Sequence, residues 1–401
     1  MPPRPQYTTF EASDGALISL KSSLPITNPD PSFIPDSPVP TFNSTSTSGS
    51  GPRARSDSKA SVIAEEGPNY SRLILLLHGF SGSSDYFDRN FDELAKNHWV
   101  VAWDMRGHGR SGLSKARKGK GNGKGEAEAG DGESAGAGAD VDGNDRKETY
   151  TGGYHVARLA TDLHNLLTCL KSSRLGPSPQ GPQSLPQPPL EVIGVGCSIG
   201  AAILWTYIEL FTDADFSGFI FVDQAPLQDR SVFGAWDSTK AHKGCYDEAT
   251  MLGAQQAWNK LPEDRHATHL GLVDECLGYR YQPLPTDKIS EEEKKEDEEF
   301  FTGISAQCPS GEWLAKLIAD HTRYDHREAC EGISKPVMVM GGKRSGCFSL
   351  EGMEEVVKRA KKGGNEKAET SWYESGHWLF WEEAERFNGE VLDFAKRCWS
   401  E

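Results

Sequence analysis

The residues of this chain best placed to do chemistry begin with a serine at a predicted strand end. Ser198 lies in the segment GCSIG (196–200), directly after the apolar run 191–195 and before a helix-forming segment. A G-x-S-x-G turn between a strand and a helix is sharp, so residues larger than glycine two positions before or after the serine would collide. This context predicts that Ser198 stands at the carboxyl edge of a sheet as the nucleophile of an acyl transfer.

A histidine follows the last predicted strand, where it can reach such a nucleophile. His377 lies in ESGHW (374–378), between the predicted strand 369–373 and the helix 381–398. An imidazole with an ordinary pKa near 6.5 can take a proton at neutral pH and return it. We therefore predict that His377 is the base. His108, in RGHGR (106–110), is interpreted as a residue that organises its turn.

The acid that should orient His377 is harder to place. It often follows the strand before the last one, in a G-x-x-D pattern, but here Ser345 occupies the aspartate position. Asp223 ends the strand after the nucleophile helix, and parallel strand ends face one cleft. We predict that Asp223 is the acid; Glu351 and Glu374 are weaker alternatives, and a serine–histidine dyad remains open.

Backbone donors for a developing oxyanion are predicted on two segments. The buried strand 72–77 ends at His78-Gly79-Phe80, and the N–H of Phe80 can pair with that of Ile199 to hold the negative oxygen. Next to these positions, four residues are predicted to contact the substrate: His78, Gly79, Cys197 and Trp378.

The elements that position these residues alternate between strands and helices, which predicts an α/β fold with a mainly parallel, twisted sheet covered by helices on both faces. A hairpin is predicted around Asp14-Gly15. The strands are predicted at 72–77, 99–103, 191–195, 218–223, 336–340 and 369–373, and the helices at 84–96, 153–171, 351–362 and 381–398.

Segment 227–330 interrupts this alternation and is predicted to be a helical cap inserted into a core of 1–226 and 331–401. Trp236, Trp258 and Trp313 either line its pocket or form its interior. Four polar stretches lack the apolar residues that a core needs and are predicted to be disordered or loosely ordered: 24–70, 113–148, 172–189 and 284–299.

Composition narrows the partners. A formal net charge of −16 disfavours nucleic acid or an anionic membrane as the main partner. The start lacks a signal-like apolar segment, no 18-residue apolar run occurs, and the 8 cysteines form no CxxC pair, so we expect a cytoplasmic protein with reduced thiols. No cofactor or metal is predicted, because His321 and His326 are five apart and off a common helix face; Asp325 and Arg327 are expected to pair there. Oligomeric state is left open.

The motifs together resemble the α/β-hydrolase superfamily, over most of 72–398. This resemblance implies the α/β-hydrolase fold and a serine-nucleophile branch, since enzymes such as haloalkane dehalogenases and epoxide hydrolases carry an aspartate where Ser198 stands. The placement of Asp223 is similar to that of zearalenone-type lactonases and cofactor-free heteroaromatic ring dioxygenases. The motifs are HGF (78–80), DMRGHGRSG (104–112), GCSIG (196–200), VDQAP (222–226) and SGHWLFWE (375–382).

Three functions follow from this site. The leading hypothesis is a serine hydrolase that cleaves a small ester or lactone through an acyl-enzyme, with a small molecule as its partner. A cofactor-free oxygenase would use His377 and Asp223 to deprotonate an aromatic hydroxyl, with Ser198 only positioning the substrate. A receptor that binds a small molecule without turning it over is the non-enzymatic alternative.

Overall fold

The structure, a computed structural model, describes residues 5–24, 26, 33–35, 69–113, 152–173, 189–228 and 239–399. The predictions made for the polar stretches 24–70, 113–148 and 172–189 lie almost entirely outside these residues.

One sheet runs through the described part of the chain and contains nine strands in the order β3-β1-β2-β5-β4-β6-β7-β8-β9. The six strands from β5 to β9 in this order are parallel, and β1 and β2 join them in antiparallel register. All five residues from Leu73 to Leu77 are fully buried, as expected for a strand covered on both faces. The strands are β1 Gln6–Glu11, β2 Leu17–Ser22, β3 Phe33–Pro35, β4 Asn69–Leu77, β5 His98–Trp103, β6 Glu191–Cys197, β7 Gly218–Val222, β8 Val337–Gly342 and β9 Ala368–Tyr373.

The predicted hairpin is confirmed and is tied to the sheet by a buried ion pair. Gly15 has a φ of 83°, which glycine adopts without steric penalty, and the Ala12 N–H donates to the Ala16 carbonyl across the turn at 2.8 Å. The Arg106 guanidinium donates to both oxygens of buried Asp162 at 2.8 Å and reaches Asp14 of the hairpin. Arg106, in the loop after β5, therefore links the hairpin to helix α2 (Val156–Ser173).

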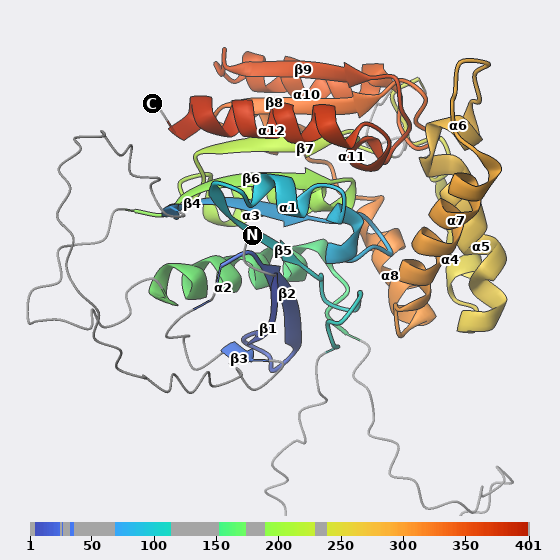
Figure 1. The fold of residues 1–401 in the computed structure, drawn as a ribbon, viewed down its shortest axis with the longest axis horizontal. Helices are drawn as coiled ribbons and strands as arrows, with labels where there is room; N and C mark the ends of the chain where they lie inside the picture. The colour runs from blue at the N-terminus through green and yellow to red at the C-terminus, as the bar shows by residue number, and fades with distance from the viewer. Residues whose placement is uncertain are drawn as a thin grey trace, which may run out of the picture.

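Helices cover both faces of the sheet, which confirms the predicted α/β architecture (Figure 1). On one face α2, α3, α9 and α10 contact each other in succession, and α1 and α12 contact each other on the other. The predicted helix 84–96 is broken into η1 and α1, and the buried Asn90 side chain between them donates to the Phe380 carbonyl and to Asn388 of α12. These elements are η1 Ser84–Phe87, α1 Phe91–Leu94, α2 Val156–Ser173, α3 Ile199–Phe211, α9 Arg327–Glu331, α10 Leu350–Lys362, α11 Leu379–Glu382 and α12 Ala384–Trp399.

Between β7 and β8 the chain forms a set of helices that gathers at one end of the sheet (Figure 1). We call α4 to α8 the helical insertion; its division from the core as a cap over 227–330 stays a prediction. Its elements are α4 Glu248–Trp258, η2 Pro262–Arg265, α5 His266–Cys276, α6 Gly278–Tyr281, α7 Glu291–Ala306 and α8 Gly311–His321.

The prediction of a loose loop at 284–299 is wrong, because most of this stretch belongs to α7. The Ser290 and Glu293 side chains form a capping box that starts the helix. Farther along, the Asp297 carboxylate is buried and accepts hydrogen bonds from the Tyr279 hydroxyl at 2.9 Å and the Trp381 indole at 2.8 Å. These partners, one from the insertion and one from α11, hold a helix whose composition alone indicated a solvated segment.

Within the described ranges, no helix has both the length and the apolar character needed to cross a membrane.

Candidate active site

Ser198 lies at the turn between β6 and α3 with a left-handed backbone (φ 53°, ψ −122°). A side chain at Gly196 would place its Cβ 2.6 Å from the Ala201 nitrogen, and one at Gly200 would place it 2.6 Å from the Leu77 carbonyl oxygen. The predicted need for glycine at both positions is therefore confirmed. Two close backbone approaches hold a partly exposed Ser198 above the end of the sheet.

The Asp223 carboxylate, fully buried at the end of β7, contacts His377 directly. Its Oδ1 accepts from the His377 Nδ1–H at 2.6 Å and from the Ser345 hydroxyl at 2.7 Å. Its Oδ2 accepts from the Gly342 N–H at 2.8 Å. Ser345, which occupies the place of the expected late aspartate, thus braces the aspartate that contacts the histidine. Glu374 is exposed and pairs with Lys343.

The half-buried Glu382 carboxylate holds the loop that carries His377. Glu382 accepts from the Gly376 N–H at 2.7 Å and from the Gly278 N–H at 2.9 Å, so it links this loop to the helical insertion. Burial raises the pKa of Glu382 to about 7, against the opposing effect of these two hydrogen bonds. The Trp378 N–H donates to the Cys276 carbonyl at 3.1 Å, which adds a second link between the same segments.

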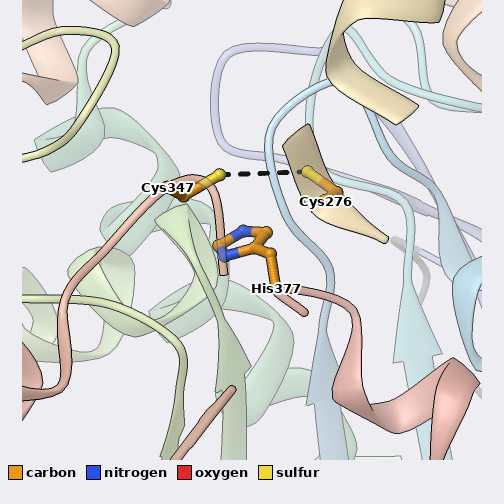
Figure 2. A group of neighbouring side chains, drawn as sticks. All are labelled: Cys276, Cys347 and His377. Carbon is orange, nitrogen blue, oxygen red and sulfur yellow. Dashed lines mark hydrogen bonds between the residues drawn. The ribbon is translucent and has the colours of Figure 1, made fainter. Parts of the chain in front are cut away.

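The second ring nitrogen of His377 faces two cysteines (Figure 2). Burial lowers the pKa of His377, but the sulfur of Cys347 and the Asp223 carboxylate outweigh it and raise the pKa to about 10. The pKa of Cys347 is held well below its usual range, through hydrogen bonds with Cys276 and His377 and the charge of His377. Both shifts arise in part from the contact between the Cys347 sulfur and the His377 imidazole.

Within the described residues, no hydrogen bond joins the Ser198 hydroxyl to His377, although both side chains line the same cavity. Catalytic hydrogen bonds are often long without substrate and tighten only in the complex. The cavity therefore contains an oriented histidine–aspartate pair together with the Ser198 side chain.

The cavity has a volume of about 400 Å³ and lies between the sheet edge and the helical insertion. Of the four residues predicted to contact substrate, Gly79 and Trp378 line it. The prediction does not fit His78 and Cys197, which are buried and absent from the lining. The lining residues are Gly79, Phe80, Ser198, Gln228, His242, Gly244, Cys245, Ala254, Ala257, Trp258, Ala267, Thr268, Gly271, Leu272, Glu275, Cys276, Ile318, His321, Cys347, Phe348, His377 and Trp378.

His78 has a structural position instead. Its Nε2 accepts from the Met105 N–H at 2.9 Å and its Nδ1 bonds the Gly79 carbonyl at 2.7 Å, so the ring joins the loops after β4 and β5. Burial lowers the pKa of His78 to about 3, and it stays neutral at physiological pH. His108 is likewise buried, with Nδ1 on the Arg106 carbonyl at 3.0 Å, which confirms its role in organising the turn.

The two predicted oxyanion donors lie on segments that meet at Ser198. A Cβ on Gly79 would lie 3.4 Å from the Ser198 Cβ, so the loop that contains Phe80 passes directly over the serine. Ile199 is the first residue of α3, and N–H groups at that position have no partner within their helix. The donor role of Phe80 and Ile199 remains a prediction that this proximity supports.

Several residues around the site escaped the sequence interpretation. Cys276 and Glu275 come from α5, and no motif links a helix of the insertion to the nucleophile. Burial and the nearby Cys347 raise the pKa of Glu275 to about 7. Cys347 stood two positions after Ser345, which was a usable signal that this loop faces the histidine.

The other sequence predictions have mixed outcomes. The Asp325–Arg327 ion pair is confirmed at 2.6 Å. Trp258 lines the cavity, whereas Trp313 is fully buried and belongs to the interior; Trp236 lies outside the described residues. His321 also lines the cavity, beside the Gln228 amide.

Comparison with known proteins supports the predicted fold. A sequence model described as "Alpha/beta hydrolase family" matches residues 74–390. The esterase EaEST from Exiguobacterium antarcticum superimposes with a TM-score of 0.59 at 15% identity, covering 97% of this chain and 98% of its own. A bromoperoxidase from Bacillus anthracis gives 0.56 at 16% identity, covering 97% and 99%. An enol-lactonase from Burkholderia xenovorans LB400 gives 0.55 at 15% identity, covering 83% and 94%. No curated protein matches the sequence. At these identities the likeness establishes the fold, and the predicted α/β-hydrolase fold is confirmed.

Proposed function

This chain belongs to the alpha/beta hydrolase family, and from that membership we propose that it is a serine hydrolase acting on a small ester or lactone. One observation carries the proposal. His377, which donates to Asp223 at 2.6 Å, lines the same cavity as Ser198. A serine at a strained turn that shares a cavity with a carboxylate-oriented imidazole is the combination that acyl transfer requires.

In the proposed mechanism, the Ser198 oxygen attacks the substrate carbonyl while His377 Nε2 takes the hydroxyl proton. The N–H groups of Phe80 and Ile199 stabilise the tetrahedral oxyanion, and one such donor is typically worth about 2.7–4 kcal/mol. His377 then gives its proton to the leaving alkoxide, and the acyl group stays on Ser198. Water, deprotonated by His377, attacks this acyl-enzyme and releases the acid. Asp223 keeps Nδ1 protonated throughout and stabilises the imidazolium.

The cavity favours a small substrate with an apolar body. About 400 Å³ is at the lower end of the range for small-molecule sites. Phe80, Trp258 and Trp378 supply aromatic surface, and Leu272 and Ile318 supply aliphatic surface. Because α4, α5 and α8 contribute many of the lining residues, we also propose that segment 227–330 acts as the cap that selects the substrate.

The test is turnover of p-nitrophenyl acetate and butyrate by the full chain and its Ser198→Ala variant. Ser198→Ala should abolish turnover and labelling by a fluorophosphonate probe while the protein stays folded. Cys197→Ala is the matched control, because this neighbouring side chain is buried and does not line the cavity. Full activity in Ser198→Ala would reject the mechanism, and a wild-type protein that never labels would favour a receptor.

A cofactor-free oxygenase is the second candidate, because the Asp223–His377 hydrogen bond of 2.6 Å suits its chemistry as well. There His377 would deprotonate an aromatic hydroxyl, which needs the Asp223 contact but no attack by serine. Oxygen consumption with a hydroxyquinolone, retained in Ser198→Ala and lost in His377→Ala, would distinguish this reaction from hydrolysis.

A further inference from the structure

Two cysteine thiols converge on the second ring nitrogen of His377. Cys276, Cys347 and His377 are all buried, and their ligating atoms lie within 4.8 Å of one another (Figure 2). We propose that these three residues bind a thiophilic divalent cation such as Zn²⁺ or Cd²⁺. The bound ion would inhibit the enzyme, because it occupies Nε2 of His377, the proposed base. The inhibitory part rests on the proposed function; the site itself does not.

The spacing of the sulfur atoms suits a metal. The Cys276 and Cys347 sulfurs lie 3.9 Å apart. Zinc–sulfur bonds of about 2.3 Å at a tetrahedral angle separate two sulfurs by about 3.8 Å. A disulfide would need them about 2.05 Å apart, so the same pair would have to move much closer together to oxidise. The two thiols therefore have the separation of metal ligands.

The histidine is already oriented as a metal ligand. Its Nδ1 donates to Asp223, and this carboxylate–histidine contact is what orients ligating histidines in zinc sites and raises their basicity. Nε2 remains for the metal. The charges of two thiolates and a neutral imidazole balance that of a divalent ion, which lowers the cost of holding this ion in a buried position.

The three ligands are held in place by backbone contacts between their segments. The Gly346 N–H, next to Cys347, donates to the Glu275 carbonyl at 2.9 Å, and the Trp378 N–H donates to the Cys276 carbonyl at 3.1 Å. These approaches require glycine, because a Cβ on Gly346 would lie 2.5 Å from the Glu275 oxygen. Ligand positions fixed before binding lower the ordering entropy that binding must overcome.

The Cys347 sulfur has a neighbouring hydrogen-bond donor, and the cavity leaves a fourth ligand position open. His242 Nδ1 accepts from the Gly244 N–H at 2.8 Å and the Cys245 N–H at 2.9 Å, so Nε2 carries its proton. That N–H hydrogen-bonds with the Cys347 sulfur and acts as a donor rather than a ligand. Glu275 lines the cavity beside the cluster, and its carboxylate or a water is available for the fourth position.

Binding is measured without reference to turnover, by titrating Cd²⁺ into the reduced, chelator-treated full chain and recording thiolate-to-metal charge-transfer absorption. One equivalent should bind. Cys276→Ser and Cys347→Ser should each weaken binding by more than about 100-fold, because losing a mere orienting partner of a ligand already costs about 10–100-fold. Ser198→Ala should bind normally.

Cys245→Ser is the matched control, because Cys245 is a buried cysteine of the same cavity but not of the cluster. Absence of charge-transfer absorption with equimolar Cd²⁺, or equal loss in Cys245→Ser, would overturn the site. In the activity arm, Zn²⁺ should inhibit ester hydrolysis and a chelator should restore it. Stoichiometric metal binding with undiminished hydrolysis would overturn the inhibitory role. If the metal-free wild type has no esterase activity, the proposed function is refuted, and the Cd²⁺ titration alone decides whether the metal site exists.

Discussion

Replacement of Asp223 by asparagine tests the site most directly, because the structure defines what each carboxylate oxygen must do. Oδ1 accepts from His377 and Ser345, and Oδ2 accepts from the Gly342 N–H. Asparagine has one oxygen for these three donors. If its oxygen stays on His377, its NH₂ group opposes the Gly342 N–H, and a buried donor without a partner costs about 1–3 kcal/mol.

Flipping the amide relieves that conflict and damages the histidine instead. The NH₂ group then faces His377 Nδ1, which must accept, so the proton moves to Nε2. An imidazole with Nε2 protonated cannot take the proton of Ser198. In serine proteases the corresponding change lowers kcat by about 10⁴-fold. At 1.36 kcal/mol per factor of ten, this is about 5 kcal/mol of transition-state stabilisation.

The assay is kcat for p-nitrophenyl acetate, read beside the thermal unfolding midpoint. Asp223→Asn should lose about 10³–10⁴-fold in kcat while remaining folded. Glu374→Gln is the control, because Glu374 was the alternative acid and is exposed beside Lys343. A loss below tenfold in Asp223→Asn, or an equal loss in Glu374→Gln, would refute the tautomer argument.

Two further predictions concern the framework of the site. Gly200→Ala should leave little soluble protein, because the new Cβ would lie 2.6 Å from the Leu77 carbonyl oxygen. Gly303→Ala in α7 is the control: its Cβ meets nothing within 4 Å, so it should be neutral or stabilising by up to about 1 kcal/mol. Soluble yield and thermal unfolding midpoints compare the two variants, and equal behaviour would contradict the packing argument. Burial raises the pKa of Glu382 to about 7 from 4.5, so the folded state binds more protons than the unfolded state between these values, and the contribution of Glu382 to stability is present below pH 4.5 and lost as pH rises through 7. Raising the pH from 5 to 8 should therefore destabilise the wild type relative to Glu382→Gln, by about 3 kcal/mol at most. Urea unfolding at both pH values measures this difference in stability, and an equal difference at pH 5 and pH 8 would exclude this explanation.

The parts of the site that sequence could reach are those fixed by local geometry. Ser198 was identifiable because two glycines and the flanking strand and helix define its turn. The approach of Asp223 to His377 was predictable because the carboxyl ends of parallel strands share one edge of the sheet. The strands of the parallel sheet were predicted within a few residues of their observed bounds, because most of them are short apolar runs that are buried between the helices.

What sequence missed depends on partners that are distant along the chain. Helix α7 was mistaken for a loop because the groups that hold Asp297, including Trp381, lie on other elements. His78 was predicted to contact substrate from its place beside Gly79, but its ring turns to the Met105 N–H after β5. Nothing in the spacing of Cys276 and Cys347 indicates that their sulfurs meet.

The position of Asp223 and the thiol cluster are two consequences of one arrangement of the loops around His377. In the more common pattern the loop after β8 supplies the carboxylate, and its residues are committed to the histidine. Here Asp223 contacts the histidine from the end of β7, and Ser345 in the β8 loop donates to that carboxylate. The Ser345 oxygen also accepts from the Cys347 N–H at 3.2 Å and the Phe348 N–H at 3.3 Å, which turns the loop back toward the cavity. This turn brings the Cys347 sulfur to His377. Because Asp223 contacts one ring nitrogen of His377, the β8 loop is free to place a thiol beside the other nitrogen. That second nitrogen can bind a proton or a metal ion, but not both at once.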